Sequence, residues 1–274
     1  MVKYIPHKWL LIALIAFSQV SCKKKMHNDP PNPSPPQVFL KDFSMANLPS
    51  PYYHFEYNPK GEISFVSVES GFKRYEVLYV NGKLADMRNN IVINKDTLRY
   101  FYQLNGLPAF VEYINETGVF RKCEFFYSGE HLIKAAWKLK VGNTYEPDRT
   151  MDLTYFNDGN VHNISEIRHA ISGRPELTIN QEFSQYDNKI NVDGFSLLYD
   201  HDNSDHLLLF NHLPIQKNNP GKVLYTGALH YQVLYTYDYN EKNCPVRRQG
   251  QLTMLSGPRK GEQFSSNATY SYYP

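Results

Sequence analysis

The densest cluster of side chains suited to chemistry lies between residues 200 and 206. It comprises Asp200, His201, Asp202, Asn203, Ser204, Asp205 and His206. Oxygen ligands at alternating positions are typical of a calcium-binding loop, but an EF-hand also needs glycine at its sixth position and glutamate at its twelfth. Neither residue is present, since Asn211 occupies the twelfth position. Two interpretations remain: a looser calcium site that includes Asp200 and Asp202, or polar caps for a short helix.

Zinc binding by the same cluster is not expected. His201 and His206 are five positions apart, which misses the three- or four-residue spacing that aligns side chains on one helix face. We therefore assign no metal ligand in this chain.

Aromatic residues are a second source of candidates, because flat rings can stack on sugars. The chain has 22 tyrosines, most of them in alternating apolar sets where a sheet needs bulky side chains for its core. Trp137, Tyr145 and Phe195 fall outside those sets. These three are the better candidates for binding a glycan.

Local signatures of catalysis are missing. The sequence has no His-Glu-x-x-His, Gly-x-Ser-x-Gly or Cys-x-x-Cys motif and no glycine-rich phosphate loop. Sites assembled from distant loops leave no such motif, so catalysis stays open. The prediction leans toward a protein without enzymatic activity, with no catalytic residue and no cofactor.

Cys22 ends a segment with the features of a secretion signal. Lys3 and Lys8 flank the start of an apolar run that ends at Phe17, much shorter than the ~20 residues of a spanning helix. Val20-Ser21-Cys22 resembles the lipobox of bacterial lipoproteins, although Gln19 stands where leucine is usual. The resemblance implies that Cys22 is the lipid attachment site. Ordinary secretory cleavage after Ser18 is the alternative.

The predicted organisation has three parts. Residues 1–21 form the lipoprotein signal peptide, and residues 22–37 form a lipidated tether rich in lysine and proline. Prolines favour an extended, stiff polyproline II conformation. Residues 38–274 form a single β domain.

Charge and cysteine content narrow the partners. Without Lys3 and Lys8 the chain has 27 basic and 27 acidic residues, which gives no basic stripe for nucleic acid. Once Cys22 carries lipid, Cys123 and Cys244 remain. A disulfide between them and two separate thiols are equally compatible with the sequence.

From Tyr52 onward the chain repeats one pattern: alternating apolar residues that end in tyrosine, a polar turn with glycine, and a second apolar stretch. Alternation places each set on one sheet face, and Asn, Asp and Gly suit tight turns. The pattern predicts five hairpins, with first strands that end at Tyr57, Tyr79, Tyr102, Tyr127 and Tyr155. A later copy has Lys189 in place of the turn glycine, so Asn188 or Lys189 is expected to carry that turn.

Two features complete the predicted elements. A short helix is expected near 202–213. The last strand pair is expected between residues 232–239 and 269–273.

The repeat resembles the tyrosine-aspartate repeats of RHS-type bacterial surface proteins. It also resembles lipid-anchored domains of unknown function from Gram-negative bacteria, in which a Tyr-Asp-x-Lys-x-Asn segment precedes an Asn-Asn-Pro loop. This chain has the first segment at 186–191 and the second at 218–220. The resemblance implies an all-β, mainly antiparallel β-meander of RHS/YD-like hairpin repeats in a single- or two-layer sheet. It transfers no catalytic residue.

The sequence thus predicts a lipid-anchored protein of the cell envelope, at the outer membrane, facing either the periplasm or the surface. Its expected role is a non-catalytic binding or structural module for a glycan or an envelope protein. A polysaccharide-acting hydrolase and a calcium-stabilised surface module are the alternatives.

Overall fold

The computed structural model describes residues 38–89, 96–171, 173–198 and 215–274. The strands within these ranges are β1 (Leu40–Met45), β2 (Tyr53–Tyr57), β3 (Ile63–Val68), β4 (Lys73–Val80), β5 (Lys83–Asn89), β6 (Thr97–Tyr102), β7 (Pro108–Asn115), β8 (Gly118–Ser128), β9 (His131–Val141), β10 (Thr144–Tyr155), β11 (Val161–Arg168), β12 (Leu177–Tyr186), β13 (Pro220–Gly227), β14 (Tyr231–Tyr239), β15 (Pro245–Met254), β16 (Gln263–Ser265) and β17 (Ala268–Tyr272). Two 3-10 turns, η1 (Glu69–Gly71) and η2 (Gly194–Leu198), are the helical elements of the described residues.

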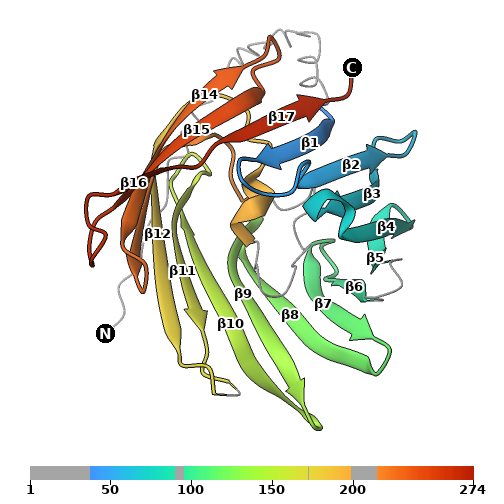
Figure 1. Ribbon diagram of the computed structural model, residues 1–274. Coiled ribbons are helices and arrows are strands. Elements are labelled where there is room, and N and C mark those ends of the chain that lie inside the picture. Colours follow the sequence, from blue (N-terminus) through green and yellow to red (C-terminus); the bar gives the residue numbers. More distant parts are fainter. Residues whose placement is uncertain (1–37, 90–95, 172, 199–214) are drawn as a thin grey trace, which may run out of the picture. The chain divides into compact units, whose positions relative to one another are not determined.

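The strands close into a barrel (Figure 1). Each strand from β2 to β15 pairs antiparallel with the next, β15 pairs with β17, and β1 pairs with both β17 and β2. Sixteen strands therefore form a ring, and β16 adds to one side of β15. The expected open meander in one or two layers is wrong. Closure removes the unpaired edges that an open sheet would expose.

β1 makes the closing seam. It pairs with β17 over five residue pairs but with β2 over two, Asp42 with His54 and Phe43 with Tyr53. His54 Nδ1 lies 2.6 Å from Asp42 Oδ1 across this short contact. A side-chain bond thus supplements the few backbone pairs of the seam.

The two faces of the wall differ in composition. Inward positions are mostly apolar and form one continuous core, with fully buried members that include Phe43, Phe55, Tyr75, Met87 and Ile164. Outward positions in the middle of strands around the ring carry charged side chains: Glu56, Arg74, Glu76, Arg88, Arg99, Glu112, Lys122, Glu124, Lys134, Lys138, Asp152, Glu182, Lys222, Asp238 and Arg247. The alternation is the one expected for an apolar interior and a wet exterior.

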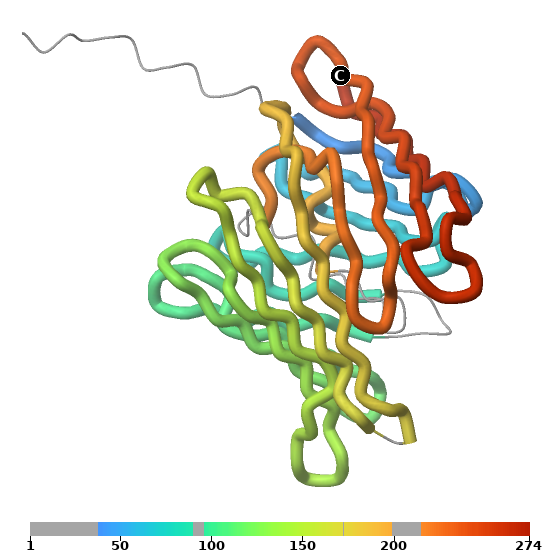
Figure 2. The backbone as a smooth tube through the Cα atoms, turned by 90° about the vertical axis from the view of Figure 1, so that its left-hand side faces the viewer, coloured from blue at the N-terminus to red at the C-terminus, as the bar shows by residue number. Residues whose placement is uncertain are grey.

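The five predicted hairpins are confirmed as β2–β3, β4–β5, β6–β7, β8–β9 and β10–β11. Each contains a register shift just before the tyrosine that ends its first strand. The turns need a left-handed residue, which glycine supplies at positions such as 61, 106 and 159. Figure 2 shows the yellow-green β9–β10 hairpin reaching beyond its neighbours.

The repeated tyrosines join one hairpin to the one before it. Tyr102 Oη donates to the carbonyl of Leu84 at 2.7 Å, and Leu84 is the cross-strand partner of Tyr79. The same bond recurs at Tyr155 to Leu132, Tyr186 to Val161 and Tyr272 to Pro245. This contact explains why the strand ends in tyrosine, since phenylalanine would fill the space without the bond.

The later copy of the repeat, which has Lys189 in place of the turn glycine, does not form a tight turn. The chain leaves the wall after Tyr186 and returns at Pro220, its antiparallel partner, so residues 187–219 are an insertion between β12 and β13. Its η2 turn lies inside the barrel, where Phe195 packs on Tyr53 and Phe55 with ring centres 5.3 and 5.7 Å apart. Neither Asn188 nor Lys189 therefore carries the expected hairpin turn.

Two further predictions concern the last strand pair and the short helix. Residues 232–239 pair with β13 and β15, and residues 269–272 pair with β15 and β1, so the predicted last pair is wrong. The helix expected near 202–213 lies outside the described residues. Within the described part of the chain, no helix is long and apolar enough to cross a membrane.

Candidate functional site

Buried charges gather on the inner face of β8, β10 and β11. The bulge between β9 and β10 shifts the register between Pro147 and Arg149, so that the adjacent residues Asp148 and Arg149 are both buried. A bulge can aim a side chain that strict alternation would turn outward. It therefore places two neighbouring charges in the interior.

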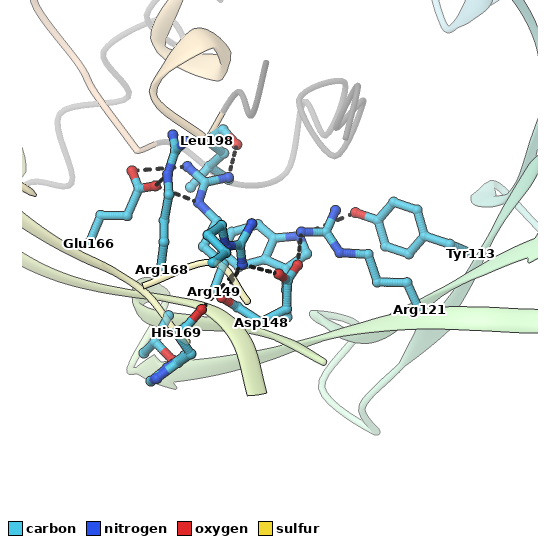
Figure 3. Close-up of polar contacts among 11 residues, drawn as sticks. Tyr113, Arg121, Asp148, Arg149, Glu166, Arg168, His169 and Leu198 are labelled. Carbon is cyan, nitrogen blue, oxygen red and sulfur yellow. Dashed lines mark hydrogen bonds and ion pairs between the residues drawn. The ribbon is translucent and has the colours of Figure 1, made fainter. Parts of the chain in front are cut away.

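We call the resulting group the inner arginine cluster: Arg121, Asp148, Arg149, Glu166, Arg168 and Arg174. Figure 3 labels the first five of these residues. Asp148 accepts hydrogen bonds from Arg121 and Arg174, each at 2.7 Å. Arg149 binds Glu166 through two parallel bonds of 3.1 and 3.2 Å. Arg168 Nε donates to the same carboxylate at 2.7 Å. Paired guanidinium and carboxylate groups are the form in which charge is tolerated inside a protein.

Trp137 connects the two halves of the cluster. The Arg149 and Arg121 guanidinium carbons lie 4.6 and 5.9 Å from its ring centre. The fully buried indole thus packs between two cations. Arg149 also donates to the carbonyl of Leu198 at 3.2 Å, which ties the cluster to the insertion.

A second buried charge pair lies on β15. Arg248 Nη1 donates to Asp193 Oδ2 at 2.6 Å, and Tyr270 donates to the same oxygen at 2.8 Å. Asp193 immediately precedes η2, so this pair fixes the insertion to β15, four strands along the wall from β11. The Arg248 guanidinium also faces Tyr235, 5.1 Å from the ring centre.

An interior cavity of about 340 Å³ lies between these two charge groups. Its wall combines aromatic rings, arginine and carboxylate groups, and amides, and its main members are Tyr53, Tyr225, Tyr235, Tyr237, Phe183, Arg149, Glu166, Arg168, Asp193, Arg248, Gln181 and Gln216. Burial raises the pKa of Tyr225 and Tyr235, so both hydroxyls keep their protons at neutral pH. The volume suits a small ligand, at the lower end of the usual range for binding sites.

The two sequence motifs of the resemblance meet at the base of the insertion. Asn191 Nδ2 donates to Asn219 Oδ1 at 3.1 Å, and Asn219 in turn bonds the carbonyl of Ile190 at 3.2 Å and the Tyr239 hydroxyl at 3.3 Å. Asp187 accepts a hydrogen bond from Tyr239. These side chains satisfy the backbone where the insertion leaves and rejoins the wall, and they are therefore structural.

The three residues expected to bind a glycan lie in different environments. Trp137 is fully buried between the two arginines, and Phe195 packs in the core beneath β1 and β2. Tyr145 is exposed on the β9–β10 hairpin, apart from any described cavity. None of the three lines the cavity.

Of the remaining candidate residues from the sequence analysis, some lie outside the described residues and some within them. Cys22 and the cluster Asp200, His201, Asp202 and His206 lie outside the described residues. Cys123 and Cys244 are separate buried thiols. The described ranges hold no group of three or more His, Cys, Asp or Glu side chains able to bind a metal.

Sequence reasoning missed the residues that line the cavity. Glu166 and Arg168 share the parity of the buried Ile164 in β11, and Arg248 shares that of the buried Gly250 in β15. A charged residue at an inward position of an alternating strand is a readable signal, because an unpaired charge does not fit there. Asp193 had no such signal, since it lies in the insertion.

Solved structures share this fold. A porin-like protein from Bacteroides vulgatus ATCC 8482 matches with a TM-score of 0.56 and 13% identity over 87% of this chain and 100% of that chain. A porin-like protein from Bacteroides uniformis ATCC 8492 matches with a TM-score of 0.52 and 10% identity over 81% of this chain and 89% of that one. At such low identity the similarity shows the fold alone: an all-β, antiparallel, closed barrel.

Other comparisons add less. The TcdB2-TccC3-TEV structure matches with a TM-score of 0.33 and 15% identity over 80% of this chain and 12% of that chain, too low to support the RHS-type resemblance. That resemblance stays a prediction. No protein-family model and no curated protein matches the sequence.

Proposed function

We propose that this chain is a lipid-anchored, non-catalytic binding protein of the cell envelope, whose barrel stands in water and holds a small saccharide in its interior cavity. The cavity is the observation that carries the proposal. It combines aromatic faces, which stack on sugar rings, with arginine, carboxylate and amide groups, which bond to hydroxyls. An interior cavity of about 340 Å³ favours a small ligand over a protein partner.

The outer face of the wall favours water over lipid. A barrel that spans a membrane has an apolar outer band ~25 Å tall, and each outward-facing Arg or Lys at the midplane costs ~2–4 kcal/mol. Here ion pairs lie across outward strand positions, for example Lys138 with Glu124 at 2.6 Å and Arg99 with Asp86 at 3.1 Å. The lipid on Cys22 would then provide the attachment to the membrane.

Fractionation of a Gram-negative host that expresses the full chain tests anchor and barrel together. We expect the wild type in the membrane fraction and Cys22→Ser in the soluble fraction. Ser21→Ala, which keeps a small residue before the cysteine, should stay with the membrane. A wild type that is soluble would disprove the anchor, and a Cys22→Ser chain that has lost its signal segment yet remains in the membrane would show that the barrel itself inserts.

Ligand binding is tested by thermal shift of the detergent-purified full chain against neutral and acidic monosaccharides and disaccharides. A ligand at 100 times its Kd adds ~2.7 kcal/mol to the free energy of unfolding, which for a domain of this size is several degrees. A saturable shift with one sugar class supports the proposal. A flat response across the panel would contradict a saccharide ligand.

Hydrolysis is the second candidate, because two carboxylates, Glu166 and Asp193, line the same cavity. Both accept hydrogen bonds from arginine, whereas a glycosidase needs one of its two carboxyl groups protonated. Binding without turnover is therefore the expected outcome. Release of a reducing sugar from a bound disaccharide, lost in Glu166→Gln and in Asp193→Asn, would favour the hydrolase instead.

A further inference from the structure

Six apolar side chains gather on the outer surface of three consecutive hairpins, β4–β5, β6–β7 and β8–β9. We call this group the outer apolar patch: Val80, Phe101, Leu104, Phe110, Phe126 and Ile133. Leu104 is completely exposed and Val80 is 61% exposed. The rings of Phe101 and Phe110 stack with their centres 4.3 Å apart. The patch therefore differs from the charged outward positions in the middle of the same strands.

The turn at Leu104 does not itself require leucine. Four hairpins close with the same turn, in which the amide of the fourth residue donates to the carbonyl of the first: 58–61, 103–106, 156–159 and 240–243. The second position holds Leu104 in one turn and a polar residue or proline in the others: Pro59, Asn157 and Glu241. Those residue types suit an exposed turn. An apolar patch that the fold does not need is typical of a surface that another body covers.

The patch lies at the end of the barrel where the predicted tether joins it. β4, β6 and β8 end beside the patch, and β2 runs in the same direction as these strands and ends at Tyr57. The Tyr57 hydroxyl donates to the carbonyl of Leu40 at 2.9 Å. Because Leu40 is the first residue of β1, the chain that leads back to Cys22 leaves the barrel at this end.

The length of this chain keeps the patch near the anchor. Sixteen residues lead from Cys22 to Val38, and they span at most ~58 Å when fully extended. The opposite end of the barrel is further away by the length of a strand, which is ~40 Å for the twelve residues of β10. A lipid at Cys22 gives the nearer end a high effective concentration at the bilayer, so a few weak apolar contacts suffice to hold it there.

Charge on this face does not oppose contact with phospholipid. Glu124 lies beside the patch, 2.6 Å from Lys138 and 3.4 Å from Lys122. The neighbouring hairpins add one charge of each sign, Lys83 and Glu130. The surface is therefore close to neutral. Its lysines can pack their apolar stems on the patch while the amino groups reach headgroup phosphates.

We propose that the outer apolar patch rests on the phospholipid surface of the membrane that holds the anchor, with Leu104 and Val80 inserted among the headgroups. This inference rests on the lipid anchor of the proposed function. Met45, Arg168 and Leu229, which line the cavity, lie at the opposite end of the barrel. The contact therefore leaves that end of the cavity in water.

Quenching by brominated lipid tests the contact. Lipidated full chain with Leu104→Trp is reconstituted into vesicles of phosphatidylcholine and phosphatidylglycerol whose acyl chains carry bromine. Phe72→Trp is the matched control, because Phe72 is 69% exposed and follows η1 at the opposite end. The wild type supplies the background, since Trp137 is fully buried. We expect a blue shift and at least about twofold quenching for Leu104→Trp, and neither for Phe72→Trp.

The outcomes separate this inference from the anchor. A chain that does not float with the vesicles would overturn the lipid anchor and the contact together. A chain that floats with them but shows equal quenching at both positions, or none at either, would overturn the contact alone. Stronger quenching of Phe72→Trp would do the same, because the opposite end would then face the lipid.

A second measurement needs no added tryptophan. Lys83, next to the patch, should react severalfold more slowly with a water-soluble acylating reagent in the vesicle-bound wild type than in vesicle-bound Leu104→Asn. Asparagine is tolerated in this turn, as Asn157 shows at the equivalent position. Lys260, exposed in the β15–β16 loop at the opposite end, should react equally in both chains. Equal rates at Lys83 would contradict the contact.

Discussion

At the scale of single residues, the interior of the barrel is organised by arginine. Arg121, Arg149 and Arg248 are each bound to a carboxylate from another strand or from the insertion. Arginine suits this role because its planar fork binds carboxylates bidentately and its face packs on aromatic rings. The three arginines thus join distant segments, and Arg149 and Arg248 also line the cavity.

Replacing one carboxylate of the inner arginine cluster with an amide is expected to lower the free energy of unfolding strongly. Asp148→Asn removes the carboxylate between Arg121 and Arg174 but keeps its shape, which leaves buried positive charge without its counterion. We expect a loss of about 3–5 kcal/mol in the free energy of unfolding. Urea denaturation of the purified chain measures it.

The matched control is Asp152→Asn in the same strand. Asp152 is about half exposed and lies 3.5 Å from Lys134, so its loss should cost less than about 1 kcal/mol. Equal effects of the two substitutions would mean that burial does not govern the energetics of the cluster.

These charges explain what sequence reading missed at this scale. Alternation in β10 assigns Asp148 and Arg149 to opposite faces, and only the register shift after Pro147 turns both inward. A bulge depends on the pairing strand, here β9, and so leaves no mark in the sequence of β10 alone. Trp137 was a candidate for glycan binding because it lay outside the apolar sets. In the structure it is fully buried and packs against the Arg149 guanidinium.

At the scale of elements, the hairpin is the unit and the tyrosine hydroxyl is its link to the preceding unit. Tyr155 Oη donates to the carbonyl of Leu132 at 2.8 Å, and Leu132 pairs with Tyr127. Tyr127 is the exception, because its buried hydroxyl has no hydrogen-bond partner. Tyr127 can therefore serve as a control for the hydroxyl bond that Tyr155 makes.

We expect Tyr155→Phe to lower the free energy of unfolding by about 0.5–1.5 kcal/mol, since a backbone carbonyl loses its donor. Tyr127→Phe should leave stability unchanged or raise it, because it removes an unpaired buried hydroxyl. Chemical denaturation of both variants compares them directly. If the two substitutions cost the same, the link between hairpins contributes nothing beyond ring packing.

Local pattern predicted these hairpins well, and the reason is that turn and alternation are both local. Asn243 shows the limit of the rule: it replaces glycine, yet it adopts φ 59° and completes the same turn, as asparagine can. Lys189 also replaces glycine, and there the chain leaves the wall instead. Which of the two happens depends on the segment that follows and not on the turn residue.

At the scale of the whole molecule, closure is the property that the sequence did not reveal. Sixteen similar antiparallel strands fit an open meander as well as a ring until β1 pairs with β17. The charged outward positions and the apolar inward ones hold for both. Barrels of sixteen strands usually enclose an aqueous channel. In this barrel the insertion and large aromatic side chains occupy the interior instead.

The filled interior makes stability sensitive to alkali. Burial raises the pKa of Tyr79, Tyr102 and Tyr231 to about 12, compared with ~10 in an unfolded chain. Between these values the unfolded chain releases protons that the folded barrel keeps. Stability is therefore complete below pH 10 and falls as pH rises from 10 through 12.

Urea denaturation between pH 8 and pH 11, with tyrosinate absorbance followed at 295 nm, measures this linkage. We expect an unchanged midpoint up to about pH 9.5 and a steep decline above it, with absorbance rising together with loss of β-sheet circular dichroism. Titration of Tyr79, Tyr102 and Tyr231 near pH 10 while the fold persists would contradict the burial that raises their pKa values.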